Sequence, residues 1–478
     1  MEINDGFHSY KKLRCVLTII MLVALLPLSI LYVAIVTLFN TLNDLHKKKR
    51  NYQVTDSSKV VMVTGGKMSK SLHFARWFWK NGYKVVMVET DKYCYSGSRW
   101  SRAVTHFETV TCPRENPDEY MDGLVKIAEK YNVDFFVPVS SPVSSIPDSC
   151  VKPRLKELGC KVLHFDLEMT QILDDKHKFC DYAKKLGLKT PTTFCVSNDD
   201  EARKLNETLM FNNLNADKSV YVLKNIEYDP KHRLDLFKMP CNPNELDAYL
   251  YKIREDGNAI TPEAPWQVQQ FIAGSQEYTC FVVLRDGKIR AITTSESSCS
   301  QLNYEHIDIP YITKWVEEFA NKTGITGQLC FDFMKDNSSG VYYPIECNPR
   351  VHSQCVTFLD TPEFGEAVLS NYWGNNKTLE PPNNSKPVFW FYNELFKAVL
   401  GSVFNYRKAH ENNTEGLSKF ISLIFKGRDS DFDVDDPLPF LMRNHCQLPY
   451  LLLDTLKKDT PWLKLDFCIG KVVELNGD

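Results

Sequence analysis

Three side chains with oxygen donors have a spacing that could hold a divalent cation. Asp332 and Glu346 lie in two apolar runs typical of β-strands, and residues 336–340 between them have the composition of a turn. Residues two apart on a strand project to the same face, so Glu346 and Asn348 share a face, and a hairpin would place Asp332 opposite them. Two close carboxylates repel each other unless a cation lies between them. Oxygen-only ligands favour Mg²⁺, with Mn²⁺ as the alternative.

Basic side chains that could neutralise phosphate accompany this set. Arg350 follows Asn348 at the same two-residue spacing and could stabilise charge on a transferring phosphoryl group or on an anionic substrate. Lys176 lies in a helical stretch and Lys224 ends an apolar strand, and both could lie against a triphosphate. An acidic hairpin face taken alone is more often a solvated surface. The ordered set of lysines, carboxylates, amide and arginine is much harder to obtain by chance.

This ordered set resembles the signature of the ATP-grasp superfamily, whose members bind ATP between two α+β lobes. The resemblance implies ATP and Mg²⁺ as bound groups and these roles: phosphate contacts for Lys176 and Lys224, adenine recognition by the backbone of Gln270, Phe271 and Ile272, ribose binding by Glu277, Mg²⁺ binding by Asp332, Glu346 and Asn348, and catalysis by Arg350 with Lys224. The sequence departs from the signature at two points. Gln270 replaces a frequent Glu, and no Gly-rich phosphate loop follows Lys224, so we expect Lys231 and Arg233 to cover the phosphates.

A narrower resemblance covers nearly the whole chain and points to the mycosporine-glycine synthase family of ATP-grasp ligases. It is carried by stretches outside the generic signature, namely 65–70, 138–145, 164–166, 173–176, 303–305, 345–353, 435–440 and 469–478. The resemblance implies a C–N ligase that joins glycine, an amino acid, to the cyclic enolone 4-deoxygadusol through a phosphorylated enol. We expect His352, as a catalytic residue, and Ser353 to hold the ring oxygens or the amine. An indirect hydrogen-bonding role is the alternative for His352.

Two further loops follow predicted strands and could contact ligands. Residues 65–70 match neither the dinucleotide fingerprint nor the P-loop, although Lys67 and Lys70 could help a helix N-terminus to hold an anion. A tight turn with solvated lysines is the alternative. Ser141 and Ser144 lie where open α/β sheets bind ligands, so we expect substrate contacts there, with a polar turn as the alternative.

The elements that must position these groups predict a mixed α/β and α+β fold. Strand and helix patterns alternate early in the chain, which indicates a parallel sheet covered on both faces. We expect a membrane anchor with basic flanks at 1–50, a Rossmann-like pre-ATP-grasp domain at 51–165, a two-lobed ATP-grasp domain at 166–373, and a mostly helical extension at 374–478. Residues 375–387 have the composition of a linker, and the apolar residues 449–453 are expected to pack on the body rather than on a bilayer.

An uncharged segment near the N-terminus predicts membrane attachment. Residues 15–43 contain no charged side chain, and ~20 apolar residues suffice to span a bilayer. Basic residues lie on both sides, and the positive-inside rule favours a membrane-associated protein whose soluble part faces the cytosol. Pro27 lies near the middle of the segment, so a bent hairpin that enters and leaves one leaflet is the alternative to a full span.

The overall charge and the cysteines restrict the function classes further. The chain has 57 basic and 60 acidic residues, a net charge of −3, which does not favour a nucleic-acid partner. The 15 cysteines form no metal-binding pairs and favour free thiols. Two functional alternatives stay open, a different ATP-grasp carboxylate–amine ligase and a membrane-bound nucleotide-binding protein without turnover. The oligomeric state is not predicted.

Overall fold

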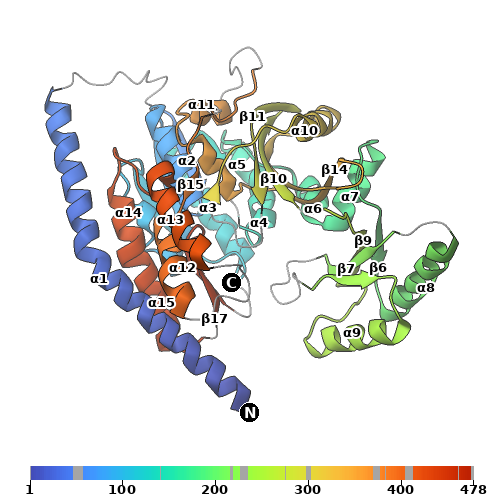
Figure 1. Cartoon of the computed structure of the whole chain (residues 1–478). Coiled ribbons are helices and arrows are strands. Elements are labelled where there is room, and N and C mark those ends of the chain that lie inside the picture. Colours follow the sequence, from blue (N-terminus) through green and yellow to red (C-terminus); the bar gives the residue numbers. More distant parts are fainter. Residues whose placement is uncertain are drawn as a thin grey trace.

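The computed structural model shows a long N-terminal helix beside a body built on one five-stranded and two four-stranded sheets (Figure 1). All cysteines that it describes are free thiols, in agreement with the scattered cysteine pattern. The described residues are 2–46, 58–139, 141–215, 219–226, 235–274, 276–297, 303–369, 377–382, 384–403, 413–460 and 462–474.

A five-stranded parallel sheet forms the first unit of the body, as the alternating pattern predicts. Its strand order is β3-β2-β1-β4-β5. Successive residues of a strand face opposite sides, so Val61 and Val63 join one core with α2, whereas Met62 joins a second core with α3. Both faces of the sheet are therefore covered. The elements are β1 (Val60–Thr64), α2 (Ser69–Lys80), β2 (Lys84–Thr90), β3 (His106–Val110), α3 (Pro117–Tyr131), β4 (Phe135–Val137), α4 (Ser145–Cys150), α5 (Lys152–Glu157) and β5 (Lys161–Val162).

Two antiparallel sheets with helices on them form the next two units. The first has the order β6-β9-β7-β8 with β6 (Thr193–Val196), β7 (Tyr221–Asn225), β8 (Phe237–Met239) and β9 (Trp266–Gln270), and carries α8 (Asp199–Asn215) and α9 (Pro243–Glu255). The second has the order β11-β10-β13-β14 with β10 (Glu277–Arg285), β11 (Lys288–Ser297), β13 (Gly327–Lys335) and β14 (Tyr342–Asn348), and packs on α6 (Leu167–Asp174), α7 (Lys176–Lys185) and α10 (Pro310–Thr323). These units are the two expected α+β lobes, and the first projects from the body (Figure 1).

The C-terminal part folds back onto the first sheet instead of forming a separate body. Leu451 and Leu452 are buried in the same core as α2, as expected for residues 449–453, although Tyr450 and Leu453 stay exposed. The segment predicted as a linker also takes part in the fold, because Leu379 bridges to Ala291 of β11. The described elements are β12 (Asn303–Tyr304), η3 (Ser353–Phe358), α11 (Phe364–Leu369), β15 (Val388–Phe389), α12 (Phe391–Val403), α13 (Asn413–Lys426), β16 (Arg428–Asp429), α14 (Leu438–Met442), η6 (Arg443–Gln447), α15 (Leu448–Lys458), β17 (Trp462–Asp466) and β18 (Lys471–Glu474).

Helix α1 (Glu2–His46) is continuous, so the bent hairpin considered from the sequence is wrong. Pro27 lies inside the helix and is accommodated without a break. The part Lys12–Leu42 has 31 residues, and an 18-residue stretch within it has a mean hydropathy of 2.9, which makes it long and apolar enough to cross a membrane. An unbroken apolar run favours one helix because each added residue gains a backbone hydrogen bond, whereas Pro27 costs only one.

Helix α1 lies along one side of the body, beside α14 and α15 (Figure 1). The Cys15 thiol donates to the Leu452 carbonyl oxygen over 3.3 Å, and the hydroxyl groups of Ser29 and Tyr392 lie 2.7 Å apart. The opposite face of α1 is exposed and apolar, and water is a poor environment for a face of this size. Its side chains include Leu13, Val16, Ile20, Val23, Leu28, Ile30, Leu31, Ile35, Leu38, Phe39 and Leu42.

Candidate functional site

The hairpin formed by β13 and β14 brings the three proposed metal ligands together. Asp332 lies directly opposite Glu346, and Asn348 lies opposite Cys330, two residues along the same strand as Asp332. The turn at 336–340 is stabilised by its own Asp336, which accepts hydrogen bonds from two serines. Local strand and turn chemistry therefore suffices to place these three side chains on one face.

The electrostatics of this face suit a bound cation. Burial raises the pKa of Asp332 to about 8, and the negative charges of Glu346 and Glu277 add to this effect. A hydrogen bond from the Thr279 hydroxyl to Asp332 (2.8 Å) acts in the opposite direction. No group of three or more His, Cys, Asp or Glu side chains within the described residues could hold a metal ion by itself. Two carboxylates and the Asn348 amide fit Mg²⁺, which usually keeps waters and takes phosphate oxygens as further ligands.

Lys224 of the other lobe lies within electrostatic range of the Glu346 carboxylate and of Lys176. Burial lowers the pKa of the Lys224 ammonium, the Glu346 carboxylate opposes this effect, and Lys176 adds to it. The structure thus places Lys224 of β7 and Lys176 of α7 close to each other and Lys224 close to Glu346. Lys176 donates to the carbonyl oxygen of Ile226 over 2.9 Å, which fixes its ammonium group beside the end of β7. Positive and negative groups from separate units meet here, as a phosphate chain with a cation requires.

Arg350 is held by a residue that the sequence interpretation did not single out. Its guanidinium group pairs with Asp174 at the end of α6 over 2.6 Å and also donates to the Asn348 side-chain oxygen. A guanidinium held at two points loses less rotamer freedom on binding a phosphoryl group. Asp174 belongs to the stretch 173–176 of the narrower resemblance. Its role as the partner of Arg350 becomes visible only in the folded structure.

Residues 270–272, expected to recognise adenine through their backbone, belong to the hinge between β9 of the first lobe and β10 of the second. The N–H groups of Gln270 and Phe271 already donate to Thr192 and Val220 carbonyl oxygens, over 2.8 and 2.7 Å. Among the three hinge residues, only Ile272 therefore has an N–H group that donates to no other residue within the described part of the chain. Glu277 begins β10 on the same face as Asp332. Lys231 and Arg233, expected to cover the phosphates, lie outside the described residues.

Gln267 is a further polar residue at the site that the sequence interpretation missed. It lies directly opposite Lys224 in the pairing of β7 with β9. Its side chain is fully buried, and neither amide atom has a partner within the described residues. Gln269, on the same face, donates to the Ile345 carbonyl oxygen over 3.2 Å. The sequence pattern that could have identified Gln267 is the alternation of glutamines along this strand, because it puts two polar side chains on a covered face.

The loop after β4 reaches the other side of Arg350. The hydroxyl groups of Ser141 and Ser144 lie 3.3 Å apart and close a polar turn. The neighbouring Ser145, which was not singled out, donates to the Pro349 carbonyl oxygen over 3.5 Å. The first sheet therefore contributes its carboxyl-end loop next to Arg350, although Ser141 and Ser144 bond mainly to each other.

His352 and Ser353 lie where β14 leads into η3. The ring nitrogen Nδ1 of His352 accepts from the Gln354 N–H over 3.3 Å. Burial lowers the pKa of His352 to about 3, and Lys70 and Arg350 add to this effect, so the ring is neutral at pH 7. Ser353 lies 3.1 Å from the Cys468 thiol.

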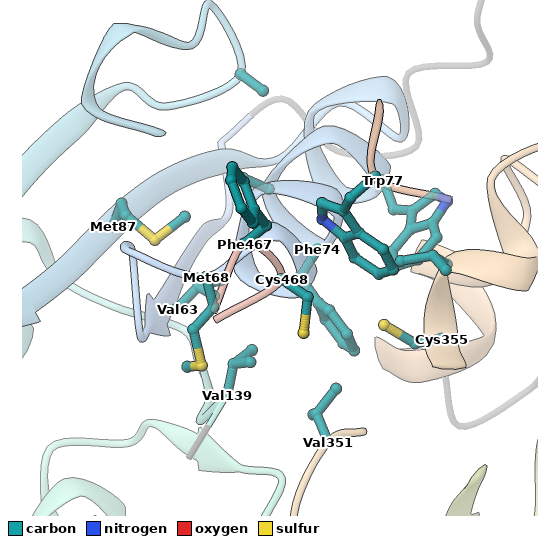
Figure 2. Packing of buried hydrophobic residues seen from close by; sticks show 14 of the residues in the cluster. Val63, Met68, Phe74, Trp77, Met87, Val139, Val351, Cys355, Phe467 and Cys468 are labelled. Carbon is teal, nitrogen blue, oxygen red and sulfur yellow. The ribbon is translucent and has the colours of Figure 1, made fainter. Parts of the chain in front are cut away.

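Figure 2 shows Cys468 with Phe467 among buried residues of several other segments, including Met68, Val351 and Cys355. A turn near the C-terminal end thus closes one side of the site. Gly470 lies in this turn, and a Cβ atom there would meet the Lys67 carbonyl oxygen at 2.3 Å. Only glycine permits this close approach between the turn and the loop 65–70.

Comparison with solved structures defines the fold. The ADP complex of an N5-carboxyaminoimidazole ribonucleotide synthetase has a TM-score of 0.53 with 14% sequence identity, covering 77% of this chain and 97% of that one. The Staphylococcus aureus N5-carboxyaminoimidazole synthetase complexed with ADP has a TM-score of 0.51 with 15% identity, covering 73% and 85%. The chain has the ATP-grasp fold.

Sequence comparison adds one distant relative with this fold type. The carbamoyl phosphate synthase large chain, C-terminal section, of Methanopyrus kandleri is 23% identical over 331 residues, covering 63% of this chain. The chain spans about half the length of that curated relative, 55%. No family model matches the chain. The ATP-grasp fold is therefore supported mainly by structure, and the reaction has to be argued from the site.

Proposed function

We propose that the protein is an ATP-dependent ligase that phosphorylates an acceptor oxygen and then forms a C–N bond. The observation that carries this proposal is that Lys224 of the first lobe lies near Lys176 and near the Glu346 carboxylate, which in turn lies opposite Asp332 in the hairpin of the second lobe. Such an arrangement suits the phosphates of ATP and a cation between them. The solved relatives of this fold are described as ADP complexes, which supports a nucleotide ligand.

Each part of the nucleotide has a proposed partner. The Ile272 N–H group donates to an adenine ring nitrogen, Glu277 binds the ribose, and the two lysines bind phosphate oxygens. Asp332, Glu346 and Asn348 would hold Mg²⁺, which would neutralise charge on the phosphates. Arg350, fixed by Asp174 at 2.6 Å, steadies the transferring phosphoryl group. The protein positions groups and neutralises charge, which is most of what phosphoryl transfer requires.

The proposed acceptor is 4-deoxygadusol and the proposed amine is glycine. What supports this choice is that several stretches of the narrower resemblance meet beside Arg350. Ser69 of the loop 65–70 and its helix donates its N–H to the Cys468 carbonyl oxygen over 3.1 Å, and the Tyr304 ring lies 5.7 Å from that of His352. These residues have no part in nucleotide binding, so they are suited to select the acceptor.

The reaction proceeds in two balanced stages. The enol of a 1,3-dicarbonyl is a vinylogous carboxylic acid, and it loses its proton as its oxygen bonds to the γ-phosphorus. The bond from that phosphorus to the bridging oxygen breaks, and ADP leaves. The amine nitrogen then bonds to the ring carbon that carries the phosphate, and the displaced electron pair moves to the distal carbonyl oxygen. Return of this pair expels phosphate, and the nitrogen loses a proton to leave an enaminone.

Membrane association is part of the proposal. The exposed apolar face of α1 and its length support attachment to a membrane. The basic residues that flank α1 favour a cytosolic position for the soluble body. A cytosolic site would have direct access to ATP and glycine.

The test is a substrate screen with the full chain in detergent or vesicles. Protein is incubated with ATP, Mg²⁺, 4-deoxygadusol and one amino acid at a time, and products are detected by mass. We expect ADP, phosphate and a glycine conjugate. If no conjugate forms with any amine, the proposed ligase function is refuted. If conjugates form only when an ordinary carboxylate is the acceptor, the protein is a carboxylate–amine ligase and 4-deoxygadusol is not its acceptor.

A further inference from the structure

Lys70, in the first turn of α2, is a buried cation without an acidic partner. Its side chain is 8% exposed, and its ammonium group donates to the Val351 carbonyl oxygen over 2.6 Å. No ion pair joins it to a carboxylate of the described residues. Burial lowers the pKa of Lys70 to about 8; the Cys468 and Cys355 thiols oppose this effect, and Arg350 adds to it. The group is therefore still mostly charged at neutral pH.

Another buried lysine and a partly buried lysine of the first unit have acidic partners, which makes Lys70 an exception. Lys152 is also 8% exposed, but it pairs with Asp166 over 2.8 Å. Lys80, on the same helix as Lys70, pairs with Asp433 over 3.2 Å. Burial of an unpaired ammonium group costs stability. The presence of Lys70 at this position therefore calls for an interaction with something other than the chain itself. A bound anion would be such a cause.

The position of Lys70 indicates which anion it meets. The chain runs from the proposed metal ligands of β14 through Arg350 to Val351, whose carbonyl oxygen binds Lys70. Lys70 thus contacts the residue that follows Arg350, and the Arg350 charge is close enough to act on the Lys70 ammonium group. A molecule that receives the phosphoryl group beside Arg350 would extend toward Lys70. The amine donor does not have to lie beside Arg350 in this way, because it reacts only after phosphoryl transfer.

We propose that Lys70 binds the distal carbonyl oxygen of a vinylogous carboxylate acceptor and stabilises the negative charge that develops on this oxygen. The inference rests on the proposed ligase function and names the acceptor contact of the same site. When the amine adds to the phosphate-bearing carbon, one electron pair moves through the conjugated system to the distal oxygen. The Lys70 ammonium donates a hydrogen bond to this oxygen until the pair returns and phosphate leaves. Such donors act most strongly in a site that excludes water.

The test compares Lys70→Met with Lys70→Arg and with Lys80→Met as a control on the same helix. We expect Lys70→Met to raise the acceptor KM and lower kcat, with kcat/KM reduced about 10- to 100-fold, the effect of losing a charged hydrogen bond. The glycine KM and the thermal shift caused by MgADP should not change. Lys70→Arg should recover part of the loss, and Lys80→Met should keep wild-type kinetics.

A second measurement uses binding alone. 1,3-Cyclohexanedione, a cyclic vinylogous acid, should inhibit the wild-type protein in competition with the acceptor, whereas neutral cyclohexanone should not, and Lys70→Met should lose this inhibition. Removal of an unpaired buried charge should also leave the melting temperature equal or higher. Unchanged acceptor kinetics, a change confined to the glycine KM, or a large fall in melting temperature would overturn the role of Lys70. Absence of any ATP-dependent conjugate from the wild-type protein would instead refute the ligase function.

Discussion

The ion pair between Arg76 and Asp436 offers a sharp test of how the C-terminal part holds α2, the helix that carries Lys70. Both side chains are 3% exposed, and their closest atoms lie 2.9 Å apart. Asp436 also accepts from the Ser101 hydroxyl (2.6 Å) and from the Arg102 N–H (3.0 Å). Arg76 has further bonds only to backbone carbonyl oxygens. The carboxylate is therefore the centre of the network.

We expect Asp436→Ala to destabilise the protein by about 3–5 kcal/mol, because it removes the carboxylate that pairs with the buried Arg76 guanidinium and leaves the more distant Asp433 as its neighbouring negative charge. The first sheet and the C-terminal part that covers it together have about 200 residues. For a unit of that size the loss corresponds to a fall in melting temperature of roughly 6–20 °C. Arg76→Met should cost less, because the carboxylate keeps two donors.

Differential scanning fluorimetry of the full chain measures these changes. The matched control is Asp122→Ala, because Asp122 pairs with Arg154 over 2.8 Å but the two side chains are 51% and 44% exposed. This exposed pair should contribute under about 1 kcal/mol, a shift below ~4 °C. If Asp436→Ala lowers the melting temperature no more than Asp122→Ala, the reasoning from burial and bonding is refuted.

Three other predictions concern the metal site, its pH dependence and the membrane helix. Glu346→Ala should abolish phosphate release while the melting temperature stays within a few degrees, and unchanged turnover would remove Glu346 from the metal site. Because the folded-state pKa of Asp332 is raised to about 8, protein in EDTA should lose stability as the pH rises from about 5 to 8, where Asp332 ionises beside Glu346. MgADP should reverse this loss and Asp332→Asn should abolish it; fluorimetry that shows no difference between EDTA and MgADP across this range would contradict the assignment. Deletion of residues 1–50 should release the protein from membranes in a flotation assay, and persistent association would implicate the C-terminal part.

The parts of the site that local patterns control could be predicted from the sequence. Strand alternation and a turn sufficed to bring Asp332, Glu346 and Asn348 to one face. Apolar periodicity likewise predicted the parallel sheet, because it fixes which faces are covered. The two lobes were expected from the resemblance to the ATP-grasp superfamily, not from periodicity. The bent hairpin considered at Pro27 was wrong, because the hydrogen bonds of a long apolar helix outweigh the local helix-breaking tendency of proline.

Contacts between distant segments could not be predicted. The bond from Lys70 to the Val351 carbonyl oxygen joins residues 281 positions apart, and no periodicity in either segment encodes it. The pairing of Arg350 with Asp174 is similar, with a separation of 176 positions. Residues near 379 have the composition of a linker, and only the edge of β11 turns them into part of a sheet. Tertiary context decides such cases.

The return of the C-terminal part to the first sheet has a consequence for biosynthesis. One face of that sheet, with Val61 and Val63, shares its core with Leu452 and Val472. About 400 residues must be translated between these two groups, which takes roughly 20–80 s at common elongation rates. During this interval the nascent chain presents an uncovered apolar surface to its surroundings. We therefore expect the growing polypeptide to depend on chaperones at the ribosome until the segments with Leu452 and Val472 have been synthesised and can cover this face.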